Sequence, residues 1–203
     1  MLVNNVRLNH CPVLSLHVGQ PIAVVLEPVI DPNELKIIAF KIGGGVVGGE
    51  TGDILRAESV REFSNMGMIV DSEDVFVSRI DVLKIDEIMS LEFKLLELKC
   101  VTKKGTKLGK IIGYTFDPTN FEIMQIVVQR PMLKALMDPE LVISRNEIVE
   151  VDDYKVTVKD EEDKIRKRAA KEDFVPNFVN PFRSGAPNYS PADNQTPDEP
   201  DIE

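Results

Sequence analysis

The chain has 203 residues with 34 acidic and 24 basic side chains, for a formal net charge of −10. Hydrophobic residues make up 43% and charged residues 29%, the balance of an ordinary globular protein. This acidity disfavours non-specific binding to nucleic acid or anionic lipid, because both need clustered lysine and arginine, and we expect no DNA partner. No apolar run reaches the ~18 residues of a spanning helix. We therefore expect a cytoplasmic protein without membrane insertion.

The first part of the chain is predicted to be β-structure. Its runs rich in β-branched residues predict strands at 13–18, 22–30 and 35–42 and a closing run at 60–70. Asp31 and Pro32 predict a turn, because Asp accepts backbone hydrogen bonds and Pro presets φ. The glycine-rich segment 43–52 is expected to be a hairpin loop. Its Glu50 stands where a phosphate-binding loop carries lysine, which argues against that alternative.

The second part of the chain shows the same succession after a connector. Apolar residues at helical spacing over 78–92 predict a short amphipathic helix, or an irregular connector packed on one domain. The predicted strands are 95–102, 108–116 and 121–129, with a closing run at 148–158. In that run Tyr154, Val156 and Val158 alternate with polar residues, so we expect all three on one buried face.

The two parts are copies of each other. Residues 19–40 align with 105–126 at an offset of 86 without a gap, and 60–70 align with 148–158 at an offset of 88. A repeated unit of this size is a small domain rather than a solenoid repeat. Two similar surfaces suit a scaffold better than a single catalytic cleft.

Each of the two copies resembles a PRC-barrel domain, and together the two resemblances cover about residues 10–160. The residues that carry the resemblance are Val13, Ser15, Leu16, Gly19, Ile22, Ala23, Val25, Ile30-Asp31-Pro32 and Leu35 in the first copy, and Gly105-Thr106-Lys107-Leu108-Gly109-Lys110-Ile111 with Phe116-Asp117-Pro118 in the second. The first copy has Ala23 where the family usually has glycine.

The resemblance implies small, strongly bent β-barrels. Well-known relatives are the cytoplasmic part of the photosynthetic reaction-centre H subunit and the C-terminal domain of a bacterial ribosome-maturation factor. Both bind proteins or large assemblies without catalysis, so the resemblance implies an adaptor.

We therefore expect a mainly β chain with two small PRC-type β-barrels in tandem, a short connector, a C-terminal helix and a disordered acidic tail. The expected parts are PRC-barrel domain 1 at 1–78, a connector at 79–92, PRC-barrel domain 2 at 93–159, a charged helix at 160–172 and a proline-rich tail at 173–203. The tail cannot build a core of its own, because it is proline-rich and acidic.

Two segments are candidate protein-binding sites. The tail places three phenylalanines four residues apart in polar surroundings, and they either bind a partner as a linear motif or dock on the chain's own barrels. The apolar loop 132–137 either caps its barrel or contacts a partner. The candidate residues are Phe174, Val175, Pro176, Phe178, Pro181, Phe182, Met132, Leu133 and Leu136.

A cluster of lysines surrounds the turn at Gly105. Its members are Lys99, Lys103, Lys104, Lys107 and Lys110. They predict either an RNA-binding patch or an ordinary solvated turn, and no aromatic residue is interleaved for base stacking. RNA processing or ribosome assembly is therefore the alternative function.

No residue pattern predicts a cofactor, a metal site or an enzyme. His10, Cys11 and His17 lie close in sequence, but a zinc site usually needs four ligands in paired spacings. Cys11 and Cys100 are the only cysteines and lie in apolar stretches, which predicts two buried thiols. A disulfide between them is the alternative.

Overall fold

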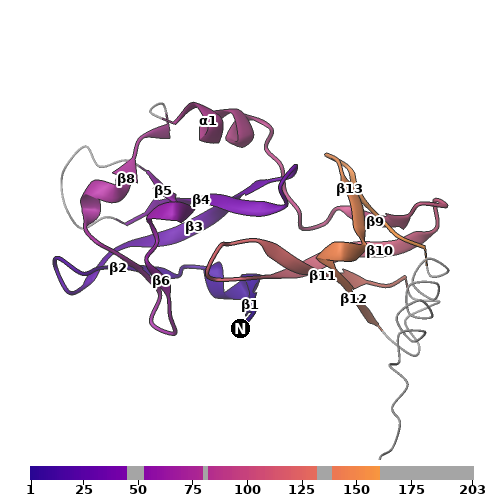
Figure 1. The fold of residues 1–203 in the computed structure, drawn as a ribbon, viewed down its shortest axis with the longest axis horizontal. Helices are drawn as coiled ribbons and strands as arrows, with labels where there is room; N and C mark the ends of the chain where they lie inside the picture. Colours follow the sequence, from indigo (N-terminus) through magenta and orange to yellow (C-terminus); the bar gives the residue numbers. More distant parts are fainter. Residues whose placement is uncertain (45–52, 80–81, 132–138, 161–203) are drawn as a thin grey trace, which may run out of the picture. The chain divides into compact units, whose positions relative to one another are not determined.

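The computed structural model describes residues 1–44, 53–79, 82–131 and 139–160. These residues form two β-sheets and one α-helix (Figure 1). The prediction of a mainly β chain is confirmed. All of the described residues belong to one compact unit.

The first sheet is built from the first copy. Its strands are β2 (Pro12–Ser15), β3 (Pro21–Asp31), β4 (Lys36–Gly43), β5 (Ile54–Arg56), β6 (Glu62–Phe63), β7 (Met68–Val70) and β8 (Phe76–Val77). Short 3₁₀ helices accompany them: η1 (Asn5–Leu8), η2 (Ala57–Ser59) and η3 (Glu73–Val75). The strand order is β6-β7-β2-β3-β4-β5-β8, and β2–β7 is the parallel pair.

The second sheet is built from the second copy and one strand from the N-terminus. Its elements are β1 (Val3–Asn4), β9 (Lys99–Thr102), β10 (Lys107–Phe116), β11 (Ile123–Gln129), β12 (Glu140–Ser144), η5 (Arg145–Glu147), β13 (Ile148–Val151) and β14 (Lys155–Val158). The strand order is β12-β11-β10-β9-β14-β13, with β1 paired to β10. Here β9–β14 is the parallel pair.

The strand order β12-β11-β10-β9-β14-β13 repeats β5-β4-β3-β2-β7-β6. The irregularities repeat as well. Leu26 in β3 and Ile112 in β10 stand at corresponding register shifts, at the offset of 86 found in the sequence. Gly19 and Gly105, at the same offset, both have positive φ in the turns that precede β3 and β10. The duplication therefore extends to the bulges that bend the strands.

Neither sheet closes by hydrogen bonding into a barrel within the described residues. In the second sheet, β12 and β13 stand at the two ends of the strand order and are joined through η5 without pairing. In the first sheet, η2 likewise separates β5 from β6. The closed barrels expected from the sequence are thus not found, because a 3₁₀ turn replaces the pairing that would complete each ring.

The two sheets meet where equivalent residues face each other. Lys36 forms an isolated antiparallel bridge with Glu122, its own counterpart at the offset of 86. The Ile37 amide donates to the Phe121 carbonyl at 3.0 Å, and the Ile123 amide donates to the Leu35 carbonyl at 3.1 Å. Exchanging the two copies converts one hydrogen bond into the other. The contact therefore has the self-complementary form of a two-fold interface.

Aromatic rings continue the core from one copy into the other. The Phe40 and Phe121 rings meet edge to face at 5.4 Å, and the Phe63 and Phe116 rings do so at 5.7 Å. Phe116 also stacks on Phe121 at 5.9 Å between centroids. Each edge-to-face pair joins a ring of the first copy to a ring of the second, so both sheets bury their inner faces in one hydrophobic cluster.

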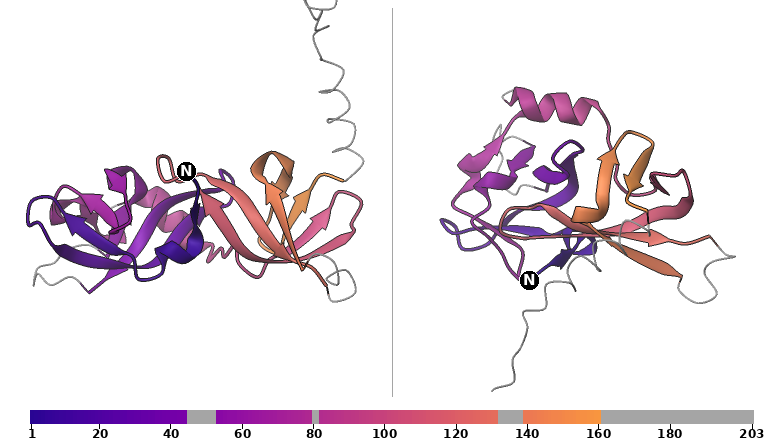
Figure 2. Two further views of the ribbon diagram at one scale, coloured as in Figure 1. Left: turned by 90° about the horizontal axis from the view of Figure 1, so that it is seen from below. Right: turned by 45° about the vertical axis from the view of Figure 1, so that its right-hand side comes forward.

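Each copy sends the segment before its first strand onto the other copy. The N-terminal β1 pairs with β10, and the Asn5 Oδ1 atom accepts the Tyr114 amide at 3.1 Å. Figure 2 shows this indigo segment beside the strands of the second sheet. The counterpart of Tyr114 is Pro28, which has no amide hydrogen to offer at that edge of β3. The first copy therefore lacks the backbone donor that Asn5 contacts in the second copy.

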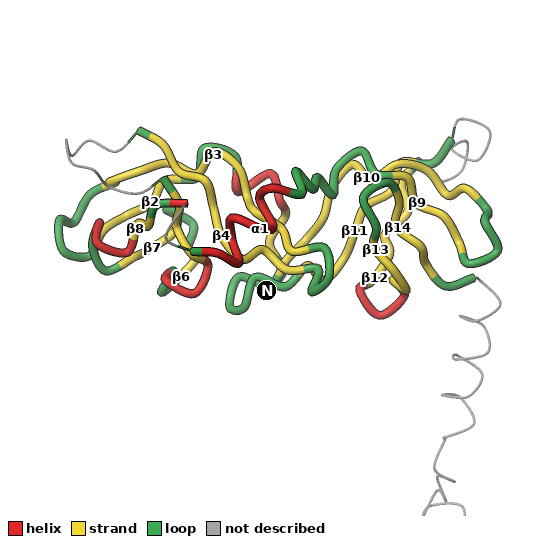
Figure 3. Tube along the Cα trace, turned by 90° about the horizontal axis from the view of Figure 1, so that it is seen from above, coloured by secondary structure: helices red, strands yellow, loops and turns green. Residues whose placement is uncertain are grey.

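The segment before the second copy forms α1 (Leu83–Ser90), as the helical spacing predicted. Its Ile85 and Ile88 pack on Val29, Ala39 and Ile54, which point away from the main core. Figure 3 shows α1, in red, against β3 and β4 of the first sheet. The helix therefore covers the outward face of that sheet.

The predicted burial of Tyr154 is wrong. Val156 and Val158 are buried, but Tyr154 is 80% exposed. The Asp152 Oδ1 atom accepts the amides of Tyr154 at 2.9 Å and Lys155 at 2.8 Å, which holds Tyr154 in the turn before β14. A turn residue does not share the two-residue alternation of the strand that follows it.

Asp31-Pro32 forms a turn, as predicted, and its counterpart Asp117-Pro118 does the same. The Asp31 Oδ1 atom accepts the Asn33 amide at 2.9 Å, and the Asp117 Oδ1 atom accepts the Thr119 amide at 2.9 Å. The hydrogen bond from the Thr119 amide lowers the pKa of the Asp117 carboxyl, because it stabilises the charged form. Neither aspartate is needed as a catalytic carboxylate to explain its presence.

We expect Gly109→Ala to destabilise the protein strongly. Gly109 has φ of +152°, and a Cβ atom there would lie 1.9 Å from the Gln129 carbonyl oxygen. The backbone strain alone costs about 1–3 kcal/mol, and the clash adds to it. Gly105→Ala is the matched control, because Gly105 also has positive φ but has open space around its Cα. Urea unfolding should show the larger loss for Gly109; equal losses would contradict the proposed close approach of β10 to β11.

Candidate interaction surfaces

Three lysines form a row across the second sheet. Lys99 in β9 lies opposite Lys110 in β10 and opposite Lys155 in β14. All three are exposed, and residues directly opposite on paired strands point to the same face. Neighbouring strands are about 4.8 Å apart, so the row places three positive charges along roughly 10 Å of one face.

The other predicted lysines lie further along the same strands. Lys107 is opposite Val101, two residues beyond Lys99. Lys103 and Lys104 are in the β9–β10 turn, and the Lys103 amide donates to the Val158 carbonyl at 3.0 Å, beside the end of β14. The structure thus brings Lys99 and Lys110 together as the sequence suggested, while Lys103 and Lys104 lie at the far end of β9.

Two acids stand beside the row. Lys110 Nζ lies 3.1 Å from Glu97, and Lys155 Nζ lies 3.7 Å from Asp152. The first pair is largely exposed and the second is partly exposed, and such pairs contribute at most about 1 kcal/mol. The acids therefore leave the lysines able to exchange them for another negatively charged group.

The fold does not require lysine at these positions. In the first copy the equivalent row consists of Val24, Pro12 and Gly67, again with Pro12 opposite Val24. The same backbone thus carries an uncharged row in one copy and three lysines in the other. The positive row, hereafter the lysine row (Lys99, Lys110 and Lys155), is a property of the second copy alone.

An apolar stripe runs beside the lysine row on the same face. In β11, Val127 lies opposite Val142 of β12 on one side and opposite Gly113 of β10 on the other. Val127 is two residues from Gln129, and Gln129 lies opposite Lys110 of the lysine row. Val142 is 54% exposed, Val127 is half-buried, and Ile112 at the β10 bulge is 38% exposed. We call Ile112, Val127 and Val142 the apolar stripe.

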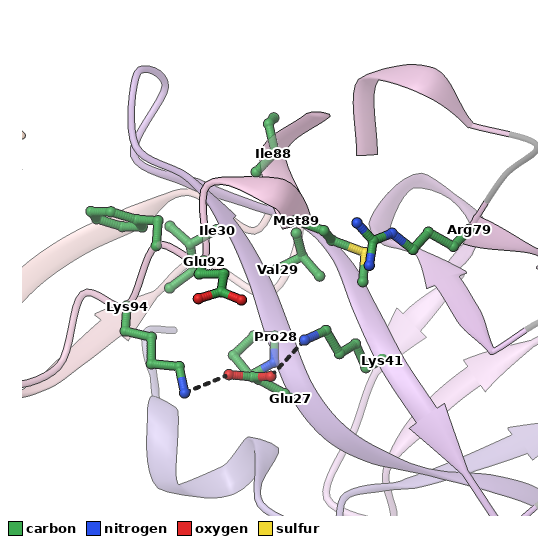
Figure 4. A pocket seen from close by; sticks show the side chains of 11 residues that line it. Glu27, Pro28, Val29, Ile30, Lys41, Arg79, Ile88, Met89, Glu92 and Lys94 are labelled. Carbon is green, nitrogen blue, oxygen red and sulfur yellow. Dashed lines mark hydrogen bonds and ion pairs between the residues drawn. The ribbon is translucent and has the colours of Figure 1, made fainter. Parts of the chain in front are cut away.

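A hollow of about 450 Å³ lies between β3 and the segment that follows α1 (Figure 4). Most of its charged side chains are paired: Glu27 binds Lys41 at 2.8 Å and Lys94 at 3.7 Å, and Arg79 binds Asp86. Glu92, which also lines the hollow, is exposed. The hydrogen bond from Lys41 is the main cause that lowers the pKa of Glu27. The Glu27–Lys94 ion pair thus connects the segment that follows α1 to the first sheet.

The predicted protein-binding residues lie outside the described residues. This holds for the tail phenylalanines and for Met132, Leu133 and Leu136. Of the flanking strands, Gln129 in β11 lies opposite Glu140 in β12. The charged segment 161–172 and most of the glycine-rich loop also lie outside the described part.

Both cysteines are buried, and they do not form a disulfide. Burial raises the pKa of the Cys11 thiol, which favours the neutral form. Among the described residues no group of three or more His, Cys, Asp or Glu side chains is arranged to hold a metal ion. Within the same ranges, no helix has the length and apolarity to cross a membrane.

Sequence reasoning missed two side chains. Lys155 joins the lysine row through the parallel pairing of β14 with β9, which local sequence patterns do not reveal. Arg145 reaches from η5 to backbone carbonyls of both copies, including that of Leu35 at 2.7 Å. A possible signal for Arg145 was its place in the repeat, where the first copy has Ala57.

Comparison with known proteins gives no identification. No protein-family model matches the chain, and no curated protein sequence matches it.

Proposed function

We propose that this protein is a non-enzymatic cytoplasmic adaptor that binds protein partners through two PRC-type β units and a C-terminal linear motif. The duplicated strand order and the bent, bulged strands support the PRC-type assignment. The two buried, unbridged thiols are consistent with a reducing compartment. In the hollow between β3 and the segment that follows α1, Glu27 is paired with Lys41 and Lys94.

One observation carries the proposal: equivalent surface positions on the two copies have diverged in chemistry. The Leu16 amide donates to the Val70 carbonyl as the Lys103 amide donates to the Val158 carbonyl, so the two turns are equivalent. Leu16 is 60% exposed, whereas lysine occupies the same place in the second copy. One scaffold with two different surfaces is what an adaptor requires to hold unlike partners.

An affinity pulldown from the native host tests the proposal. Full-length protein should retain a protein partner that a 1–172 truncation loses, because the truncation removes Phe174, Phe178 and Phe182. The thermal midpoint should not change if the motif acts on a partner; a lower midpoint in the truncated protein would instead support docking on its own barrels. Met132→Ser with Leu136→Ser in the full-length chain tests the loop separately. Absence of any specifically retained protein would contradict the adaptor proposal.

A second candidate function is that of an accessory protein in RNA processing or ribosome assembly. The lysine row favours it, because lysine is a common phosphate ligand and the fold does not need these charges. RNA retained in the same pulldown by both the full-length and the truncated protein, and released by salt, would support this candidate.

A further inference from the structure

In the first sheet, the face that points away from the main core is covered by the helix α1. Beneath α1 lie Val29, Ala39 and Ile54, all of them buried by Ile85 and Ile88 of the helix. The helix is only eight residues long and carries Lys84, Asp86 and Glu87 among its apolar residues. A short amphipathic helix with an excess of one acidic residue is therefore sufficient to cover the outward face of one unit.

The corresponding face of the second sheet is not covered in this way. The counterparts of Val29, Ala39 and Ile54 are Thr115, Gln125 and Val142. Thr115 and Gln125 bond to each other across the strands at 3.2 Å, and Val142 remains more than half exposed. On this face, therefore, Thr115 and Gln125 are paired with each other, whereas the apolar Val142 is open to solvent.

The neighbouring residues on this face also differ in chemistry between the two copies. Where the first sheet has the Glu27–Lys41 ion pair, the second has Gly113 and Val127. Val127 extends the apolar surface from Val142 toward Ile112, and so forms the apolar stripe. Apolar residues in place of a charged pair are not expected on a face that contacts only water.

We propose that the outward face of the second sheet binds an acidic amphipathic helix of a protein partner. The apolar side of that helix packs on the apolar stripe, and its acidic residues face the lysine row. This inference rests on the adaptor function and specifies the chemistry of one partner. It follows from the helix seated on the equivalent face and from the charge complementarity between three lysines and an acidic helix.

The same features favour a helix over RNA on this face. RNA phosphates would engage the lysine row but would leave the apolar stripe in water. An amphipathic helix uses both in one contact, with apolar anchors at helical spacing and charges at its flank. Tyr154, in the turn before Lys155, is 80% exposed and is a single aromatic ring rather than a row of stacking platforms.

A defined peptide tests the proposal with the full-length protein. The probe is a synthetic amphipathic peptide of about four turns with leucine at helical spacing and glutamate elsewhere. Fluorescence anisotropy at low salt should detect binding that weakens at least about tenfold in Val142→Asp and again in Lys99→Glu with Lys110→Glu. Leu16→Asp, on the equivalent turn region of the first copy, is the matched control and should bind normally. These positions are exposed, so the variants should fold normally.

Each other outcome overturns the proposal. Equal binding of the peptide with lysine in place of glutamate would exclude recognition by the lysine row. Binding that is unchanged by Val142→Asp would place the site elsewhere. Displacement of the peptide by an oligouridylate at similar concentration would assign the face to RNA. If the peptide does not bind while the pulldown still yields a tail-dependent partner, the adaptor function stands and this surface is excluded.

Discussion

Replacing Arg145 with alanine should lower the free energy of unfolding by about 2–4 kcal/mol, since three charged hydrogen bonds to backbone carbonyls, two of them partly buried, are lost. One guanidinium nitrogen donates to the Leu35 carbonyl at 2.7 Å and to the Ile123 carbonyl at 3.1 Å. Another donates to the Glu34 carbonyl. A single side chain thus ties the turn before β4 to the start of β11. The expected loss is large because the contact joins two copies that meet through few backbone hydrogen bonds.

Urea unfolding followed by circular dichroism measures this loss. Arg61→Ala is the matched control, because Arg61 pairs with Asp71 on an exposed surface and should cost less than about 1 kcal/mol. Arg145→Lys keeps the charge but loses the planar fork of donors, and should fall between the wild type and Arg145→Ala. If Arg145→Ala is no less stable than Arg61→Ala, these contacts do not hold the copies together.

Phe116→Ala is expected to cost about 3–5 kcal/mol, the usual range for removing a buried phenylalanine. Phe116 is fully buried and lies between Phe63 of the first copy and Phe121 of the second. Its loss leaves a cavity that both sheets line. Unfolding of the variant should remain a single transition at lower denaturant, because the two sheets share the damaged core.

Phe116→Leu serves as the control, since it retains most of the apolar volume and should cost clearly less than Phe116→Ala. Tryptophan is absent from the chain, so far-ultraviolet circular dichroism and the near-ultraviolet tyrosine signal are suitable probes. Two separate transitions, with only one shifted by Phe116→Ala, would show that the sheets unfold independently and would contradict the shared core.

Local patterns predicted the strands and turns well. The β-branched runs and the Asp-Pro turns gave β3, β4, β10 and β11 within a few residues of their observed bounds. The strand predicted over 95–102 begins only at Lys99, because Glu97 takes positive φ and interrupts the extended chain. Turn chemistry also explains the error at Tyr154, where an aspartate side chain, rather than the alternating pattern, fixes the conformation.

Contacts between distant segments could not be predicted from the sequence. The lysine row depends on β14 lying parallel to β9, and no local signal gives that pairing. The exchange of the N-terminal segment and α1 between the copies likewise depends on tertiary packing. The contrast between Pro28 and Tyr114 indicates in retrospect only which copy offers a backbone amide to Asn5.

The bridge between Lys36 and Glu122 has a consequence for self-association. These two residues are equivalent, so a pair of identical first copies joined in the same way would place two lysines face to face, and a pair of second copies would place two glutamates there. Like charges directly opposite on paired strands are destabilising. Only a first copy paired with a second copy, as found within this chain, places opposite charges at this contact. The contact therefore favours a first copy paired with a second copy over two like copies, whether the two belong to one chain or to two.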